Sequence, residues 1–276
     1  MISVGLAYKR IKATKAPNLS TSSRFFTFLR LKIKRAIVRN ILRIRPNREH
    51  LFGQVFKFAD YKSFLLLFEE IFINLEYYFP DEKPPAFILD CGSNIGMATL
   101  FFKLIYPNSR VIAFEPDQYA FSCLQENIEK NHWTDVKAYN VALSDSVGQT
   151  TFFIDPARPG SLDMSTIQER MPKASVKVST DILSKYVNGQ VDLVKLDVEG
   201  AELTILEELV KTGKLKSIKR IVLEYHHHIH RDRDELAQFL KILEAHGFGY
   251  LIKGNTSPPF KAGTFQDIII YAYTKA

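Results

Sequence analysis

The stretch Ile88-Leu-Asp-Cys-Gly-Ser-Asn-Ile-Gly96 decides the fold of this 276-residue chain. Its first residues are apolar, as in a buried strand, and an apolar helical pattern follows its last glycine. A strand, a glycine-containing loop and a helix in this order are typical of an open parallel sheet, which binds ligands beyond the carboxyl ends of its strands. We expect Gly92 and Gly96 to let the backbone turn sharply and approach a ligand closely.

The rest of the chain after Ala86 repeats the same alternation. Short runs rich in β-branched and aromatic residues alternate with helical patterns, which predicts βα units on a mostly parallel sheet. The expected strands span 86–90, 110–115, 136–140, 191–196, 218–224, 249–253 and 267–273. The expected helices span 96–105, 118–131, 201–210 and 232–246. Only a turn at 254–259 separates the last two strands, so one terminal strand should be antiparallel, and 149–184 should form an insertion with a short β-like pair over the sheet edge.

Charge divides the chain into three predicted zones. Residues 1–48 form a basic arm that holds 13 of the 37 Lys and Arg and none of the 30 Asp and Glu. Such an arm favours contact with an anionic surface, above all phospholipid, and a solvated, partly disordered arm is the alternative. A helix is expected from Phe25 to Ile44, with an apolar stripe at Phe25, Leu29, Ile33, Ala36 and Ile37. A helical lead-in at 49–85 should pack against the body at 86–276 and could cover the mouth of an active site.

Composition narrows the class of protein further. Hydrophobic residues make up 46% of the chain and charged residues 24%, as in ordinary globular domains. Two cysteines are too few for a disulfide scaffold, and the sequence shows no secretory signal and no apolar run long enough to cross a membrane. We therefore expect a cytoplasmic protein that can also bind at the periphery of a membrane.

An acidic residue ends the second expected strand. Glu115 lies 19 positions after Gly96, where its carboxylate can accept hydrogen bonds from both hydroxyls of a ribose. NAD enzymes and methyltransferases share this arrangement. The loop reads Gly-x-Asn-x-Gly rather than Gly-x-Gly-x-x-Gly and begins with Asp90, which suits the ammonium and sulfonium groups of S-adenosylmethionine better than a pyrophosphate. We expect the cofactor to be bound by this loop and by a later acid, with Asp90 acting near the amino-acid end through water or a backbone amide: Asp90, Gly92, Ser93, Asn94, Gly96 and Asp197.

The sequence resembles the FkbM-type methyltransferases, which are Rossmann-like S-adenosylmethionine enzymes. The matching stretches lie within residues 86–225 in the expected order: 88–96, 113–116, 140–145, 160–162, 191–202 and 222–224. The resemblance implies an α/β fold with a seven-stranded, mostly parallel sheet, one antiparallel strand and helices on both faces. It also implies methyl transfer to oxygen of a small molecule, sugar or glycan, and places Asn140, Val141 and Ala142 against the adenine.

Polar residues gather at the ends of two further expected strands. Lys195, Asp197 and Glu199 alternate and share one face while the chain is extended, and Glu224 and His226 do the same on the next strand. Burying such groups is costly unless they pair, which indicates a catalytic cluster. His226 is the preferred general base for a hydroxyl acceptor. A divalent metal on Asp197, Glu199, Glu224 and His226 is the less expected alternative. The neighbouring His227, His228 and His230 are interpreted as surface-loop residues.

Three other functions fit the sequence less well. An NAD-linked oxidoreductase would need the third glycine and a catalytic Tyr-x-x-x-Lys pair. A catalytically silent binding module would not need the full polar set. A nucleic-acid methyltransferase would need an Asn/Asp-Pro-Pro-Tyr/Phe segment to bind an extruded base, so nucleic acid is not an expected partner.

Overall fold

A computed structural model describes residues 2–37, 46–80, 83–162, 164–171, 173–230, 233–254 and 263–275. Its centre is a seven-stranded sheet in the order β5-β4-β3-β9-β10-β12-β11. The strands are β3 (Phe87–Cys91), β4 (Arg110–Phe114), β5 (Val136–Tyr139), β9 (Leu193–Leu196), β10 (Arg220–His227), β11 (Phe248–Gly254) and β12 (Gln266–Thr274). The first five are mutually parallel, and β12 is antiparallel to both of its neighbours. The predicted α/β fold and its antiparallel strand are therefore confirmed, while most of the predicted turn at 254–259 lies outside the described residues.

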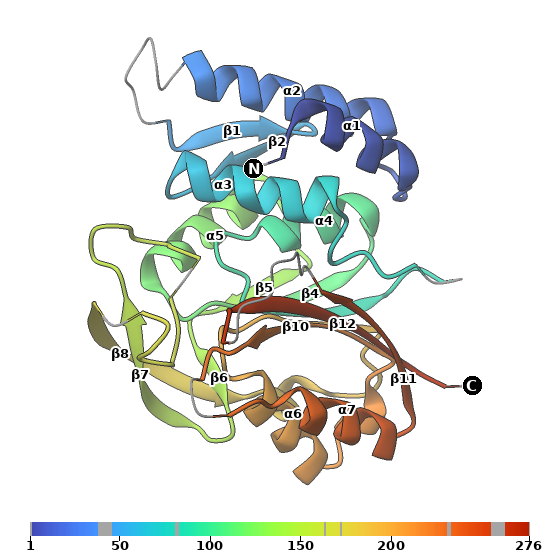
Figure 1. The fold of residues 1–276 in the computed structure, drawn as a ribbon, viewed down its shortest axis with the longest axis vertical. Helices are drawn as coiled ribbons and strands as arrows, with labels where there is room; N and C mark the ends of the chain where they lie inside the picture. Colours follow the sequence, from blue (N-terminus) through green and yellow to red (C-terminus); the bar gives the residue numbers. More distant parts are fainter. Residues whose placement is uncertain are drawn as a thin grey trace.

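Helices cover both faces of this sheet (Figure 1). Helices α4 (Met97–Ile105) and α5 (Gln118–Lys130) lie on one face, and α6 (Glu202–Lys211) and α7 (Leu236–Ala245) on the other. Consecutive residues of a strand point into separate apolar cores on the two faces of the sheet. Ile88 packs in the core beneath α4, and Leu89 packs in the core beneath α6. The order of strands reverses between β3 and β9, which is the place where such sheets bind ligands.

The insertion after β5 forms a second, three-stranded sheet. It consists of β6 (Ala142–Ser144), β7 (Gly148–Ile154) and β8 (Ala174–Ile182) in the order β6-β8-β7. The antiparallel pair β7 and β8 was expected, but β6, which runs parallel to β8, was not. Three residues give too short a pattern to predict a strand, and the pairing partner lies far along the chain.

The segment before the body contains a hairpin that the helical prediction missed. Strands β1 (Arg48–Leu51) and β2 (Gln54–Lys57) pair antiparallel, and the two residues between them, Phe52 and Gly53, both have positive φ. Positive φ at both positions is the requirement of a tight two-residue hairpin turn, for which Phe-Gly is a weak sequence signal. The predicted helical stretch follows as α3 (Tyr61–Phe68) and a π-helical turn, η2 (Glu69–Ile73).

Two helices of the basic arm pack onto this lead-in (Figure 1). They are α1 (Val4–Ala13) and α2 (Thr21–Ile37), and the remainder of the helix expected to reach Ile44 lies outside the described residues. The predicted apolar stripe is wrong, because α2 buries Arg24, Phe28 and Leu31 and leaves Ile33 51% and Ile37 41% exposed. The reason is that a charged residue occupies the buried face, which an apolar pattern cannot reveal.

Arg24 is fully buried and anchors α2 to the lead-in. Its guanidinium donates to the carbonyl oxygens of Phe72 at 2.7 Å, Ile73 at 3.2 Å and Thr14 at 3.1 Å. Burial lowers the pKa of Arg24 to about 10, which leaves it charged at neutral pH. A cation at the carbonyl end of a helical segment is favourable, so this arginine joins three segments of the chain.

Candidate active site

A cavity of about 280 Å³ opens at the carboxyl ends of β3, β4, β9 and β10. The lead-in covers one side of it through Leu66, Leu67 and Ile71, as expected for a segment over an active-site mouth. The insertion supplies another wall through Phe152 and Met164. The cavity therefore lies at the switch point of the sheet and is enclosed by the two segments added to it.

The glycine loop after β3 is held by its neighbours. The backbone N–H groups of Gly92 and Ser93 donate to the Phe114 carbonyl at 3.0 and 2.9 Å. A Cβ added to Gly92 would lie 1.7 Å from the backbone oxygen of Asp197, and one added to Gly96 would lie 2.7 Å from Leu124. Both glycines have positive φ. The sharp turn expected at both glycines is therefore observed, and packing adds a second requirement for them; the close approach of Gly92 to a ligand stays a prediction.

Of the predicted loop residues, Gly92, Ser93 and Asn94 line the cavity, whereas Asp90 and Gly96 lie behind it. Asp90 is fully buried and accepts a hydrogen bond from Thr99 Oγ1 at 2.6 Å. Burial raises the pKa of Asp90, and Lys195 opposes this rise. Asp90 therefore supports the loop from behind the cavity, and its indirect interaction with a ligand through water or a backbone amide stays a prediction.

Glu115 follows β4 and projects into the cavity. Its two carboxylate oxygens accept hydrogen bonds from the N–H groups of Asn94 and Asp117, each at 2.8 Å. Each oxygen keeps a second lone pair for a ligand. Burial raises the pKa of Glu115 to about 8. The buried Asn94 Oδ1 beside it has no hydrogen-bond partner among the described residues.

The segment after β5 divides between the wall and its support. Val141 and Ala142 line the cavity, together with Phe114 and Leu143, and form an apolar surface. Asn140 does not line it: its amide donates to the carbonyl oxygens of Glu115 at 2.8 Å and Pro116 at 3.0 Å. Asn140 therefore positions the Glu115 loop, and Val141 and Ala142 offer the flat apolar contact expected for adenine.

Lys195 links the glycine loop to the far end of the cavity. Its ammonium donates to the Gly92 carbonyl at 2.6 Å and lies 3.0 Å from Asp197 Oδ2 and 3.7 Å from Asp90 Oδ1. Burial opposes the charge of Lys195, but Asp197 and Asp90 outweigh it and raise its pKa. A lysine held in this charged state does not abstract protons, so we assign it a positioning role.

Tyr77, from the loop after η2, bridges two acids of the cluster. Its hydroxyl lies 2.9 Å from Asp197 Oδ2 and 3.1 Å from Glu224 Oε2, and one phenolic proton serves only one of them. Burial and the charge of Asp197 raise the pKa of Glu224 well above its usual range. Despite burial, Lys195 and His226 lower the pKa of Asp197. The arrangement of protons that agrees with both pKa shifts has a protonated Glu224 that donates to the Tyr77 hydroxyl, which in turn donates to an ionised Asp197.

His226 lies at the centre of the remaining carboxylates. Its Nδ1 is 3.1 Å from Glu202 Oε1, while its Nε2 is 3.5 Å from Glu199 Oε1 and 3.7 Å from Asp197 Oδ1. Glu202 accepts from the backbone N–H of Gly200, which fixes its orientation. Although burial lowers the pKa of His226, Glu199 and Glu202 raise it well above 6.5. The carboxylates thus favour the charged imidazole, so His226 can act as a base only in its neutral form, which becomes more populated as the pH rises, while Glu202 orients the ring.

All five predicted catalytic residues lie at this cavity, but Glu199 reaches it by a different backbone path from the one expected. Strand β9 ends at Leu196, and Glu199 has a φ of 56°, so it does not reach the cavity by strand alternation. A left-handed turn places it there, where Arg170 Nε binds its Oε2 at 2.9 Å. The ligand atoms of Asp197, Glu199 and His226 lie within 4.8 Å of one another, as do those of Glu224, His226 and Asp267. Either group has the donors and spacing of a divalent metal site.

Sequence reasoning did not identify four polar residues that line this cavity: Glu70, Tyr77, Arg170 and Asp267. They come from the lead-in, the insertion and the last strand. Burial, together with nearby Glu76 and Asp197, raises the pKa of Glu70 to about 8. The sequence pointed to Glu70 and Tyr77 only indirectly, through the expectation that the lead-in could cover the mouth of an active site.

The strand order, the buried Glu115 and the acidic cluster define a Rossmann-like S-adenosylmethionine-dependent methyltransferase. The cavity fits that cofactor, since Glu115 and the unpartnered Asn94 oxygen face one end of it and apolar residues line its wall. The chain belongs to the methyltransferase FkbM domain family, which matches residues 90–250. This assignment sets aside the NAD-linked oxidoreductase and the silent binding module.

Three curated relatives show the range of the family. Methyltransferase 1 of Beauveria bassiana is 31% identical over 69% of this chain and 84% of its own length. The 31-O-demethyl-FK506 methyltransferase FkbM of Streptomyces tacrolimicus is 27% identical over 72% of this chain and 85% of its own. The 2-O-methyltransferase NoeI of Sinorhizobium fredii is 28% identical over 48% of this chain and 62% of its own. Two of the three are named for methylation at oxygen.

Proposed function

We propose that the enzyme transfers a methyl group to a hydroxyl oxygen of a small, hydroxyl-rich acceptor, such as a sugar or glycan. The observation that carries this proposal is the acidic end of the cavity, which Glu70, Asp197, Glu199, Glu224 and Asp267 line. Carboxylates accept hydrogen bonds and therefore match hydroxyl donors. The relatives named as O-methyltransferases support the same chemistry.

Each residue of the site then has a defined part in the reaction. Bound S-adenosylmethionine supplies an electrophilic methyl group at its sulfonium. Glu115 binds the ribose hydroxyls, and the loop Gly92–Asn94 binds the amino-acid end. Lys195 holds that loop against Asp197. In its neutral form, His226 accepts the proton of the acceptor hydroxyl at Nε2 while Glu202 orients the ring through Nδ1, so the rate should rise with pH as His226 loses its proton. Leu66, Leu67 and Ile71 exclude water above the reacting groups.

Direct base catalysis is preferred over a metal for an electrostatic reason. Cations of the protein already compensate two of the candidate ligands, because Lys195 pairs with Asp197 at 3.0 Å and Arg170 with Glu199 at 2.9 Å. A divalent ion would have to compete with both. Addition of Mg²⁺ or Mn²⁺ to EDTA-treated enzyme should therefore not raise the rate of methyl transfer. A rate that depends on either ion would contradict base catalysis by His226 without a metal and would favour a divalent ion held by Asp197, Glu199 and His226.

The acceptor class can be tested with S-adenosylmethionine that carries an isotopically labelled methyl group. The enzyme should label sugars, glycans or other polyhydroxylated compounds and should not label matched amine or thiol acceptors. Labelled product should be resistant to treatments that cleave methyl esters, since the expected product is an ether. Exclusive labelling of amines would contradict the proposal.

A second proposal concerns where the enzyme works. We infer that the outward face of α2 binds an anionic phospholipid surface, because Phe26 is 66% exposed and shares that face with Ile33 and Ile37, within an arm that carries no acid. Vesicles of phosphatidylserine should bind the protein in a salt-sensitive manner, and phosphatidylcholine vesicles should not. The double substitution Phe26→Glu and Ile33→Glu should abolish binding; unchanged binding would exclude this face. Among the described residues, no helix is long and apolar enough to span a membrane.

A further inference from the structure

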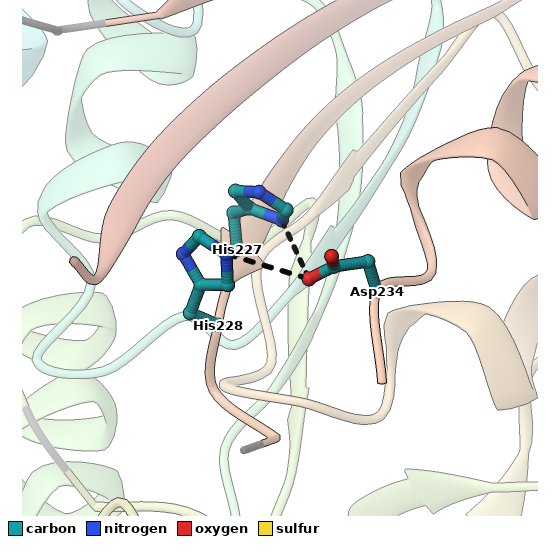
Figure 2. Close-up of side chains that lie close together, drawn as sticks. All are labelled: His227, His228 and Asp234. Atoms are coloured by element: carbon teal, nitrogen blue, oxygen red, sulfur yellow. Dashed lines mark ion pairs between the residues drawn. The ribbon is translucent and has the colours of Figure 1, made fainter. Parts of the chain in front are cut away.

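A cluster of His227, His228 and Asp234 lies outside the reaction just described (Figure 2). His227 is the last residue of β10. Asp234 immediately precedes Glu235, the N-cap residue of α7. The interpretation as surface-loop residues fits His228, which lies in the turn after β10, but not His227, which belongs to the strand. Both side chains are only partly exposed, and they converge on one carboxylate. The cluster therefore calls for an explanation other than solvent exposure.

The backbone at His228 is what brings the two rings together. Consecutive residues of a strand point to opposite faces, so His226 enters the active site and His227 points away from it. His228 would point back, but its φ of 64° turns the chain. Its ring consequently lies beside that of His227, with ring centroids 3.8 Å apart. A left-handed conformation at a residue with a Cβ is uncommon and is consistent with a function that requires this placement.

The spacing of the three side chains matches a metal site better than an ion pair. Asp234 Oδ1 lies 3.6 Å from His227 Nδ1 and 3.5 Å from His228 Nε2, which is too long for direct hydrogen bonds. Ligands about 2.0–2.1 Å from a tetrahedral ion lie about 3.3 Å from one another. All three ligand atoms already lie within 4.8 Å of one another, so small side-chain movements would complete the geometry.

His228 also has the outer contact that metal-binding histidines use. Its Nδ1 lies 2.6 Å from the Thr264 carbonyl oxygen, to which it donates, and this leaves the lone pair of Nε2 directed towards Asp234. His227 Nδ1 lies 3.2 Å from the Tyr225 hydroxyl, and an ion would replace this contact. The hydroxyl of Tyr225 keeps its bond from the Glu235 N–H at 2.9 Å.

We propose that His227, His228 and Asp234 bind a divalent transition-metal ion of the Zn²⁺, Co²⁺ or Ni²⁺ type, with water completing the coordination. Two imidazoles and one carboxylate suit these ions and are poor ligands for Mg²⁺. The ion would fasten the end of β10, which carries Glu224 and His226, to the segment before α7 and, through His228, to Thr264. The site is thus a structural metal site beside the active site and does not depend on the proposed acceptor.

Calorimetry and Co²⁺ absorption on tag-free protein test this site directly. Wild-type protein should bind one Co²⁺ with the visible absorption of a four- or five-coordinate ion, and Zn²⁺ should raise its Tm. His228→Asn and Asp234→Asn should each weaken Co²⁺ binding about tenfold or more. His246→Asn is the matched control, because the His246 ring lies at the other end of α7 and bonds the Ile242 carbonyl of that helix, and this variant should bind as the wild type does.

The active-site carboxylates could also bind Co²⁺, so a second variant separates the two clusters. Glu199→Gln removes a ligand from the catalytic cluster and should leave the Co²⁺ spectrum unchanged if the ion lies at His228. Loss of the spectrum in Glu199→Gln, its retention in His228→Asn, or the absence of binding by the wild type would each overturn the proposal. Circular dichroism of the variants establishes that they are folded.

Discussion

Single carboxylates shape the chemistry of the cavity, and Glu115 is the clearest case. The sequence predicted its position because a βα unit fixes the distance from the glycine loop to the end of the next strand. The raised pKa of Glu115 could not be predicted, since it results from burial under segments that are distant in the sequence. The same is true of Tyr77, which reaches Asp197 across 120 positions of sequence.

Glu115 should make adenosine binding dependent on pH. Its pKa of about 8 means that the unliganded protein is mainly protonated there at pH 7 and mainly ionised at pH 9. Ribose hydroxyls bind the ionised form, so the affinity for 5′-methylthioadenosine should rise about tenfold between these pH values. This ligand lacks the titrating ammonium of the full cofactor. Glu115→Gln should bind more weakly with no such rise; an equal rise in the variant would assign the effect to another group.

His226 should affect the rate and not the binding of the cofactor. His226→Asn keeps a hydrogen-bond donor for Glu202 but cannot accept a proton, so kcat should fall about 100-fold or more. The Kd for S-adenosylhomocysteine, measured by calorimetry, should stay within about twofold of the wild-type value. A variant with normal kcat would remove His226 from the mechanism. Tyr77→Phe is a useful comparison, because it removes the bridge between Asp197 and Glu224 but no proton acceptor.

At the scale of elements, the sequence predicted the sheet and missed the short strands. All seven central strands were predicted within three residues of their observed ends, because each one is a short run rich in β-branched, aromatic or other apolar residues, and four of them, β3, β4, β9 and β10, are largely buried. Strands β1, β2 and β6 have four residues or fewer, and their stability comes from pairing that local patterns do not encode. The insertion and the hairpin were therefore the least predictable elements, although both lie beside the cavity or its cover.

The contact of β3 with β9 gives a prediction about element packing. Gly92→Ala would place a methyl group 1.7 Å from the Asp197 backbone oxygen, so the strand ends must separate. The free energy of unfolding should fall by about 3 kcal/mol or more, measured with urea. Gly189 has a similar φ of 84° and open space around it, so Gly189→Ala should cost only about 1 kcal/mol for backbone strain. Equal losses would show that φ alone governs both positions.

At the scale of the whole molecule, the basic arm is part of the core. Ala7, Ile11, Phe28 and Leu31 belong to the same buried cluster as α3 and α4, and the acids Glu49 and Glu69 of the lead-in pair with lysines and arginines of α2. The charge pattern indicated an interaction with an anionic surface and gave no sign of this packing. Part of the positive charge of the arm therefore forms ion pairs with acids of the lead-in.

Removal of residues 1–48 should consequently prevent stable folding. The truncated protein would expose Phe64, Phe68 and Phe72, which the arm and lead-in bury together. It should aggregate or show a greatly reduced Tm by circular dichroism. Arg24→Met in the full chain should lower stability more mildly, by about 2 kcal/mol, since it leaves buried carbonyl groups unpaired. A truncated protein with the Tm of the full chain would show that the arm is dispensable.

The measurement that tests the central account most directly is isothermal titration of S-adenosylmethionine into the full-length protein. Wild type should bind one molecule with micromolar affinity, and Glu115→Ala should weaken binding at least about tenfold, equivalent to about 1.4 kcal/mol. Glu129→Ala, at an exposed position of α5, should bind as the wild type does. If the wild type binds no cofactor, or if Glu115→Ala binds it equally well, the cavity between Glu115 and His226 is not the cofactor site.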